Sequence, residues 1–178
     1  MTKAFKRITI VIAIAVVSLT AVNLMVFAAG ARINNTKSIP LGLYWLTTDP
    51  IETGAYVMFC PPQTPDFEAA KSRGYIGPGS CPGGYGYMMK RVLAAKNDTV
   101  NITDEGVYVN GERLPLSTPI AADKSGRPLK RLQTAHFTLT DSELLLMSDI
   151  NAQSFDGRYF GPINRSQIKG VIRPILTW

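Results

Sequence analysis

The chain opens with a long apolar stretch. Residues 8–31 form 24 consecutive positions without a charged side chain. Because about 20 apolar residues in a helix span the hydrocarbon core of a bilayer, residues 1–31 are predicted to contain a membrane-spanning helix. The small-x-small sequence Ala29-Gly30-Ala31 is also typical of the site where an export signal is removed, but the apolar region of such a signal is usually about 7–15 residues long. We favour an anchor, with a cleaved export signal as the alternative.

After residue 32 the hydrophobic pattern changes to short alternating runs. Alternation with a period of two, bounded by turn residues, is typical of β-strands. The runs that predict strands are residues 56–59, 87–95, 99–109, 137–139, 143–147 and 170–176. Asn110-Gly111 indicates a two-residue hairpin turn, and the polar, turn-rich residues 115–131 predict an exposed loop. We therefore expect a mainly β fold that forms one unit from residue 32 to residue 178.

Residues 61–86 look like an insertion in this β pattern. They are rich in proline, glycine and serine and contain one short helical pattern, at residues 66–72. Cys60 and Cys81 are the two cysteines of the chain, and an oxidising compartment outside the cytoplasm permits a disulfide between them. Such a bridge would stabilise the fold by about 3 kcal/mol in the chain-entropy model. Two thiols and the single His136 offer too few ligands for a metal, so we expect no metal and no other cofactor.

The charges are distributed unevenly along the chain. Lys3, Lys6 and Arg7 precede the apolar stretch, and all 13 acidic residues follow it. The positive-inside rule then keeps the first seven residues in the cytoplasm and exports the rest. Without these three bases the exported part carries 16 basic and 13 acidic side chains, a net charge of about +3. The basicity is therefore partly a topology signal, and the expected partner is a membrane and not nucleic acid.

Three local clusters carry candidate chemistry, and their order along the chain is more informative than any one of them. They are residues 35–44 (NTKSIPLGLY), residues 87–92 (YMMKRV) and residues 154–161 (SFDGRYFG). In this order they resemble the signal peptidase I family, and the short Ser-x-Pro-x-Gly-x-Tyr form after the apolar stretch is similar to its conjugative-transfer branch, the TraF type. The resemblance spans almost the whole chain. It implies a signal-peptidase-like catalytic β domain with an N-terminal transmembrane helix.

A serine–lysine pair is the chemistry that these clusters favour. A serine hydroxyl is a weak nucleophile at neutral pH and needs a neighbouring base. Lysine can be that base when burial among apolar groups lowers its pKa from about 10.4, and Lys90 lies in a strand-like run with Met88, Met89, Val92 and Leu93 around it. Ser38 follows the apolar stretch by seven residues, close to the membrane surface where a tethered substrate presents its cleavage site. We expect Ser38 to be the nucleophile and Lys90 its general base, as the resemblance implies.

Four further residues are expected to support this pair. The backbone N–H of the nucleophile is a candidate oxyanion donor, and Thr36 matches a family position whose hydroxyl assists it. The resemblance also implies that the Ser154 hydroxyl orients the lysine amine and that Asp156 and Arg158 brace the site. On a strand, Asp156 and Arg158 would share one face and could pair with each other, with Arg91 or with a substrate group. Without the resemblance, Thr36 is as well explained as a solvated turn residue, and the acid–base pair as an exposed salt bridge of little value.

His136 is the alternative base, because Ser-His-Asp machinery is the commoner solution among serine hydrolases. It lies in the sequence TAHFT, with no glycine elbow or partner signal nearby. We interpret it as a strand residue without a role in chemistry.

The expected function is cleavage of a peptide bond through an acyl-enzyme ester. The sequence departs from the common family pattern in having Pro40 two positions after the nucleophile, Ile39 in place of a usual methionine and Gly157 in place of a serine. These departures argue against a general secretory preprotein as substrate. The conjugative branch implies a pilin precursor instead, with the ester resolved either by water or by the amino terminus of the pilin, which gives a cyclic product. The sequence leaves these two outcomes open.

The same resemblance predicts the location and the partners of the protein. It implies a single-pass protein of the bacterial inner membrane, with residues 32–178 as a periplasmic serine peptidase domain and other conjugation proteins as further partners. Cleavage near Ala31 would leave a soluble periplasmic enzyme. The competing class is a non-enzymatic, membrane-anchored pilus assembly factor in which Ser38 and Lys90 are incidental, and an ordinary leader peptidase is a milder alternative.

Overall fold

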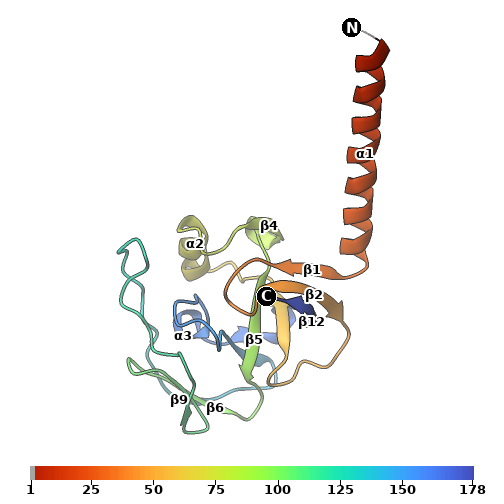
Figure 1. Cartoon of the computed structure of the whole chain (residues 1–178). Coiled ribbons are helices and arrows are strands. Elements are labelled where there is room, and N and C mark those ends of the chain that lie inside the picture. The colour runs from red at the N-terminus through yellow and green to blue at the C-terminus, as the bar shows by residue number, and fades with distance from the viewer. Residues whose placement is uncertain (1–2) are drawn as a thin grey trace.

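The N-terminal helix stands away from a β-rich body in the computed structural model, which describes residues 3–178 (Figure 1). Helix α1 spans Lys3–Ala28. Its segment Ala4–Ala28 is long and apolar enough to cross a membrane, and its most apolar part is not packed inside the protein. The predicted apolar helix is therefore confirmed by length and composition. Residues 1 and 2 of the predicted segment 1–31 lie outside the described residues.

Seven strands form the larger sheet, in the order β1-β2-β12-β3-β5-β10-β11, and neighbouring strands are antiparallel. Their bounds are Ala31–Asn34 (β1), Gly42–Thr47 (β2), Tyr56–Phe59 (β3), Met88–Ala94 (β5), Glu143–Met147 (β10), Ile163–Asn164 (β11) and Ile168–Thr177 (β12). Because β1 follows α1 almost directly and lies at the edge of the sheet, the loop after β1 stays close to the end of the apolar helix. That loop carries Ser38.

Four strands form the smaller sheet, in the order β8-β7-β6-β9. Their bounds are Thr99–Ile102 (β6), Val107–Val109 (β7), Glu112–Arg113 (β8) and Thr134–Thr138 (β9). Asn110 and Gly111 join β7 to β8 with positive φ angles of 52° and 85°, as the predicted hairpin turn requires. Apolar side chains of the two sheets, among them Ala94, Val100 and Leu145, share one core cluster, which fixes the smaller sheet against the strands that build the site.

The insertion is attached to the larger sheet by a covalent bond and by apolar packing. It contains α2 (Pro65–Ser72), β4 (Pro78–Cys81) and a short 3₁₀ turn at Pro82–Gly84. Cys60 and Cys81 form the predicted disulfide, with their Cα atoms 5.5 Å apart. Phe67 of α2 is buried in the same cluster as the two cysteines and Phe59 of β3. The insertion is therefore more regular than its composition predicted.

The strand predictions are correct for β3, β5, β10 and β12, and the structure corrects others. The predicted run 99–109 is two strands, because the Thr103 hydroxyl accepts hydrogen bonds from the N–H groups of Glu105 and Gly106 in a turn between them. The strand predicted at 137–139 occupies Thr134–Thr138. The most important correction concerns Asp156 and Arg158, which do not lie on a strand. Asp156 caps the short helix α3 (Gly157–Phe160), and its carboxylate accepts the N–H of Arg158, an ordinary role for aspartate at a helix N-terminus.

Candidate active site

Lys90 lies in the middle of β5, where alternate side chains face the interior. The buried positions are Met88, Lys90, Val92 and Ala94. Because β5 pairs with β3 on one side and with β10 on the other, its register is fixed and the lysine shares the buried face. Lys90 is 1% exposed. Burial lowers the pKa of its amine to about 8; the negative charge of Asp156 opposes this shift and the positive charge of Arg158 adds to it.

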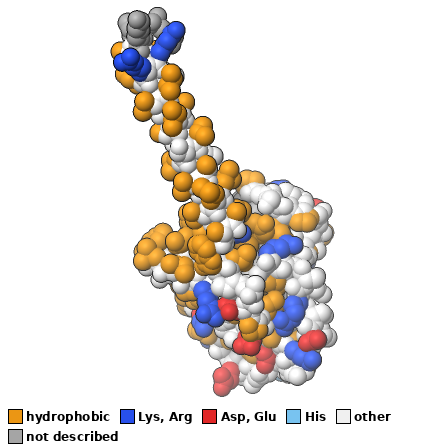
Figure 2. All heavy atoms as spheres, turned by 90° about the vertical axis from the view of Figure 1, so that its right-hand side faces the viewer, with side chains coloured by type: hydrophobic (Ala, Val, Ile, Leu, Met, Phe, Trp, Pro, Cys, Tyr) orange, Lys and Arg blue, Asp and Glu red, His pale blue; other side chains and the backbone are white. Residues whose placement is uncertain are grey.

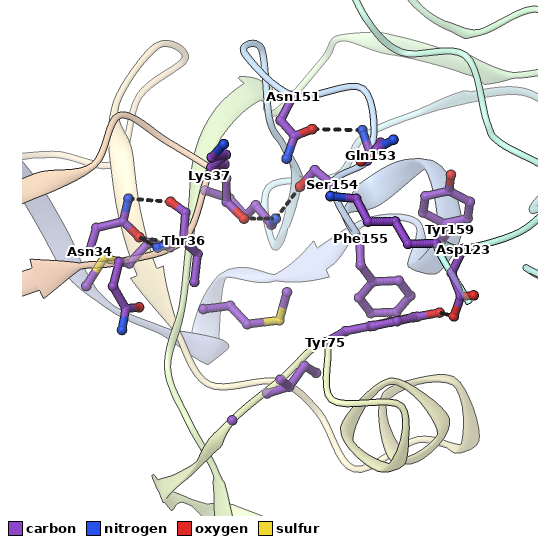
Figure 3. Close-up of a pocket in the computed structure, with 18 of the residues that line it drawn as sticks. Asn34, Thr36, Lys37, Tyr75, Asp123, Asn151, Gln153, Ser154, Phe155 and Tyr159 are labelled. Atoms are coloured by element: carbon purple, nitrogen blue, oxygen red, sulfur yellow. Dashed lines mark hydrogen bonds between the residues drawn. The ribbon is translucent and has the colours of Figure 1, made fainter. Parts of the chain in front are cut away.

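Two serine hydroxyls meet the Lys90 amine. Its Nζ lies 2.7 Å from the Oγ of Ser38 and 2.6 Å from the Oγ of Ser154. Ser154 is buried, whereas Ser38 is half-buried and lines an open groove. Figure 3 shows Ser154 at one end of this short chain of hydrogen bonds. At these distances a neutral amine can accept the Ser38 proton while the Ser154 hydroxyl holds the amine in place.

The loop that carries Ser38 is held by Asn34, a residue that the sequence analysis missed. The buried amide of Asn34 donates to the carbonyl oxygens of Thr36, Ile39 and Pro40 at distances of 2.8, 2.9 and 3.0 Å. Its Oδ1 accepts hydrogen bonds from the backbone N–H and the hydroxyl of Thr36. One side chain therefore fixes the backbone on both sides of Ser38. An asparagine just before a turn is a known turn signal, but contacts five and six residues further on become visible only in the fold.

Thr36 lines the groove, but its hydroxyl points to Asn34 and not to Ser38. The Oγ1 of Thr36 donates to the Oδ1 of Asn34 at 2.9 Å, and Figure 3 shows the two residues together on one side of the groove. The structure thus places Thr36 beside the serine–lysine pair as a residue that shapes the loop.

The rest of the Ser-x-Pro-x-Gly-x-Tyr motif has a structural explanation. The hydroxyl of Tyr44 donates to the carbonyl oxygen of Pro40 at 2.7 Å, and burial raises the pKa of Tyr44 to about 12, so the hydroxyl keeps its proton. Ile39 and Tyr44 are fully buried in one core cluster. A Cβ at Gly42 would lie 2.1 Å from the carbonyl oxygen of Leu176 in β12, so only glycine fits there. The motif therefore fixes the shape of the loop around the serine.

Asp156 and Arg158 form a fully buried pair behind Ser154. Arg158 Nε and Nη2 donate to the two carboxylate oxygens of Asp156 at 2.7 and 2.9 Å, and both side chains are 0% exposed. Arg158 Nη1 also donates to the carbonyl oxygens of Leu116 and Ala152, which ties loop 115–131 to the segment that carries Ser154. The pair is therefore not the exposed salt bridge expected from the sequence without the resemblance. Arg91, another predicted partner, pairs with Asp149 instead.

The serine–lysine pair opens into a groove of about 380 Å³. Figure 3 shows Asn34, Thr36 and Lys37 on one side and Tyr75, Phe155 and Tyr159 on the other. Tyr75 belongs to the insertion, and its hydroxyl donates to Asp123 of loop 115–131. This contact joins the insertion to loop 115–131 in the second wall of the groove. Both segments were predicted from the sequence only as irregular. His136 is exposed on β9 and lines a different hollow, against the smaller sheet.

A serine hydroxyl bonded to a buried lysine that loses its proton easily is the arrangement of serine hydrolases that use lysine in place of histidine. Together with the groove, it defines a candidate serine peptidase. The model of the family described as signal peptidase, peptidase S26, matches residues 1–178, and the chain belongs to this family. The family inferred from the order of the three clusters is therefore confirmed, and so is the mainly β fold predicted from the alternating runs.

The chain is also similar to individual known proteins. The chain is 64% identical to "Plasmid transfer protein TraF" of Escherichia coli over 178 residues, which cover 100% of both chains. It is 36% identical to "Conjugal transfer protein TraF" of Agrobacterium fabrum over 162 residues, or 90% of each chain. A solved structure of a signal peptidase I from Enterococcus faecalis aligns with a TM-score of 0.38 at 18% identity, covering 71% of this chain and 100% of that chain.

Proposed function

We propose that this protein is a serine endopeptidase in which Ser38 attacks the scissile carbonyl while Lys90 takes the serine proton. The protonated lysine then gives its proton to the leaving amine, and an acyl-enzyme ester on Ser38 remains. The backbone N–H of Ser38 makes no hydrogen bond within residues 3–178, so it is free to donate to the oxyanion. In this mechanism Ser154 orients the amine, Thr36 shapes the nucleophile loop, and Asp156 and Arg158 brace the segment behind Ser154.

The burial of Lys90 is the observation that carries this proposal. With a pKa of about 8, about a tenth of the lysine is neutral at pH 7, roughly 300 times the fraction at its ordinary pKa of 10.5. The 2.7 Å contact with Ser38 gives this neutral amine a proton to accept. Burial among apolar neighbours thus supplies what an exposed lysine lacks as a base.

The membrane location is supported by an apolar face beside the end of α1. Ile33 of β1 and Leu176 of β12 both lie opposite Leu43 of β2, so the three side chains share one face of the sheet. Ile33 is 72% exposed, Leu176 63%, and the terminal Trp178 71%. Figure 2 shows hydrophobic side chains gathered on the body next to the base of the helix. A bilayer would cover this face, with α1 as the anchor and residues 32–178 as one periplasmic unit.

For the substrate we propose the precursor of a conjugative pilin, which meets other proteins of the conjugation apparatus at the inner membrane. The similarity to two proteins named for plasmid or conjugal transfer supports this choice. An anchored enzyme whose nucleophile lies ten residues beyond the end of its helix is suited to a substrate held in the same membrane.

The test is to replace Ser38 and Lys90 separately by alanine and to follow the pilin precursor by mass spectrometry in cells that carry the full transfer apparatus. We expect the unprocessed precursor to accumulate in both variants, and also in Lys90→Arg because a guanidinium stays charged. Ser166→Ala and Lys169→Ala, at exposed positions outside the groove, are matched controls and should process normally. Normal processing in the Ser38 and Lys90 variants would indicate an assembly factor instead. A mature product one water lighter than the linear form would show release by the amino terminus of the pilin.

A further inference from the structure

The basic side chains that line the groove outnumber the acidic ones. Its charged lining residues are Lys37, Lys90, Asp123, Lys124 and Arg127. Asp123 accepts hydrogen bonds from the Tyr75 hydroxyl and, at 2.6 Å, from the Arg127 side chain. These contacts, the tyrosine bond above all, hold the pKa of Asp123 well below its ordinary range. Asp123 therefore stays ionised and its charge is matched by Arg127.

Lys37 and Lys124 have no acidic partner of this kind among residues 3–178. Within residues 3–178 neither ammonium has a hydrogen-bond or ion-pair partner. The acids behind the groove are not available to them, because Asp149 is paired with Arg91 and Asp156 with Arg158. Two positive charges at the rim of the groove are thus left without a counter-charge from the chain itself.

The two lysines approach the groove from different walls. Lys37 directly precedes Ser38, and Figure 3 shows it on the side of Asn34 and Thr36. Lys124 follows Asp123, which Figure 3 shows across the groove beside Tyr75. A single unpaired lysine on a surface is ordinary, and Lys169 of β12 is one. Two at one concave site, beside a nucleophile, create a positive potential that draws in anionic groups.

We infer that the substrate supplies the missing negative charge: the segment that enters the groove carries a carboxylate within a few residues of the scissile bond. This inference rests on the proposed peptidase function and makes charge a basis of substrate choice. An acidic side chain and the C-terminal carboxylate of a substrate cut close to its end have the same chemistry. Because exposed ion pairs are weak, each lysine should raise kcat/KM for the matching peptide by up to about fivefold at low salt, and by less at high salt.

The test measures kcat/KM for a set of matched peptides with the full-length protein in detergent micelles. Peptides from the cleavage region of the pilin precursor, capped at both ends, carry Glu, Gln or Lys at each position flanking the cut in turn. A further Gln peptide has a free C-terminal carboxylate. We expect the order Glu above Gln above Lys at one or more positions, or a gain from the free C-terminus. The first result assigns the charge to a side chain and the second to the chain end, and either preference should shrink as salt is added.

Charge-reversal variants then locate the effect. Lys37→Glu and Lys124→Glu should each lower the ratio of rates for the carboxylate peptide and its neutral partner, and the double variant should favour the Lys peptide. Lys169→Glu makes the same change in net charge outside the groove and should keep the wild-type ratio. Because each ratio is taken within one variant, a general loss of activity does not mimic the result.

Two outcomes would overturn the inference, and they differ in their consequence for the peptidase proposal. If the wild-type protein cleaves the charged and neutral peptides equally at low salt, or if neither lysine variant changes the ratio, the inference fails and the peptidase proposal stands. If no peptide is cleaved and no ester forms on Ser38, both fail together.

Discussion

Lys90 is held in an environment that disfavours its charged form, and replacing it by methionine should reveal the cost. Methionine has a similar length and no charge, and it fits the buried register of β5. We expect Lys90→Met to abolish processing. At neutral pH we also expect the variant to resist unfolding better than the wild-type protein, which is the opposite of what most buried substitutions do.

The magnitude follows from the two pKa values of Lys90. Folding lowers the pKa from 10.5 to about 8, so between these values the unfolded chain binds more protons than the folded one, and the free energy of unfolding rises with pH. Below about pH 8 the folded protein carries the full free-energy cost of burying the charged lysine. At about 1.4 kcal/mol per pKa unit this cost is on the order of 3 kcal/mol. Methionine removes this cost but leaves two serine hydroxyls without their partner, at about 1 kcal/mol each. The net gain is about 1 kcal/mol near pH 7, and it becomes a loss of about 2 kcal/mol above pH 10.5.

The assay is urea unfolding of the full-length protein in detergent micelles at several pH values, followed by tryptophan fluorescence. Both tryptophans report on the larger sheet, because Trp45 lies in β2 and Trp178 directly follows β12. Lys169→Met is the matched control, and it should change the free energy of unfolding by no more than about 0.5 kcal/mol at any pH. A Lys90→Met protein that is destabilised by the same amount near pH 7 and near pH 10 would refute the argument, because the lysine would then carry no burial penalty.

Three further predictions concern the base, its brace and the insertion. The value of kcat/KM on a pilin-derived peptide should rise with pH and level off above the Lys90 pKa of about 8, since only the neutral amine accepts the serine proton; a flat profile from about pH 6 to pH 9 would argue against a lysine base. Asp156→Asn should lower the free energy of unfolding in urea by about 3–5 kcal/mol because it leaves the buried charge of Arg158 unpaired, and a loss below about 1 kcal/mol would contradict a fully buried pair. Reduction of the Cys60–Cys81 bridge should lower the free energy of unfolding by about 3 kcal/mol and slow peptide cleavage, because the insertion forms part of one wall of the groove; unchanged unfolding after complete reduction would show that the packing of α2 alone holds the insertion.

Local patterns predicted those parts of the fold whose cause is local. Alternation placed β3, β5 and β10, and Asn110-Gly111 marked its hairpin because a type I′ turn needs positive φ at both residues. The short strands β1 and β2 were missed, because the intervening loop reads as turn chemistry and only pairing with each other and with β12 makes them strands. Helix α3 was missed for a similar reason, since four residues are too few to show a period and only the cap at Asp156 defines it.

The candidate site was predictable to the extent that the order of motifs reveals it. Ser38 and Lys90 are 52 residues apart, and no spacing rule joins them; the resemblance of three ordered clusters suggested the pair that the fold brings into hydrogen-bond contact. Asn34 could not be found in this way, because its importance lies in contacts with the loop carbonyls. The unmatched charges of Lys37 and Lys124 were equally invisible, since pairing is a property of space and not of sequence.

The Asp156–Arg158 pair shows how a buried base can be braced by a carboxylate whose charge is paired with a neighbouring guanidinium. A lone carboxylate near Lys90 would favour the ammonium form and weaken the base, and Asp156 does raise the pKa of Lys90 in this way. The adjacent guanidinium lowers that pKa in return, so it offsets part of the effect of Asp156 at the amine. Both side chains also form hydrogen bonds with the neighbouring backbone: the Asp156 carboxylate accepts the N–H of Ser148, and the Arg158 guanidinium donates to the Ala152 carbonyl. A paired acid and base can therefore fix the segment that carries Ser154 while the apolar surroundings of Lys90 still set its proton affinity, which neither charge could do alone.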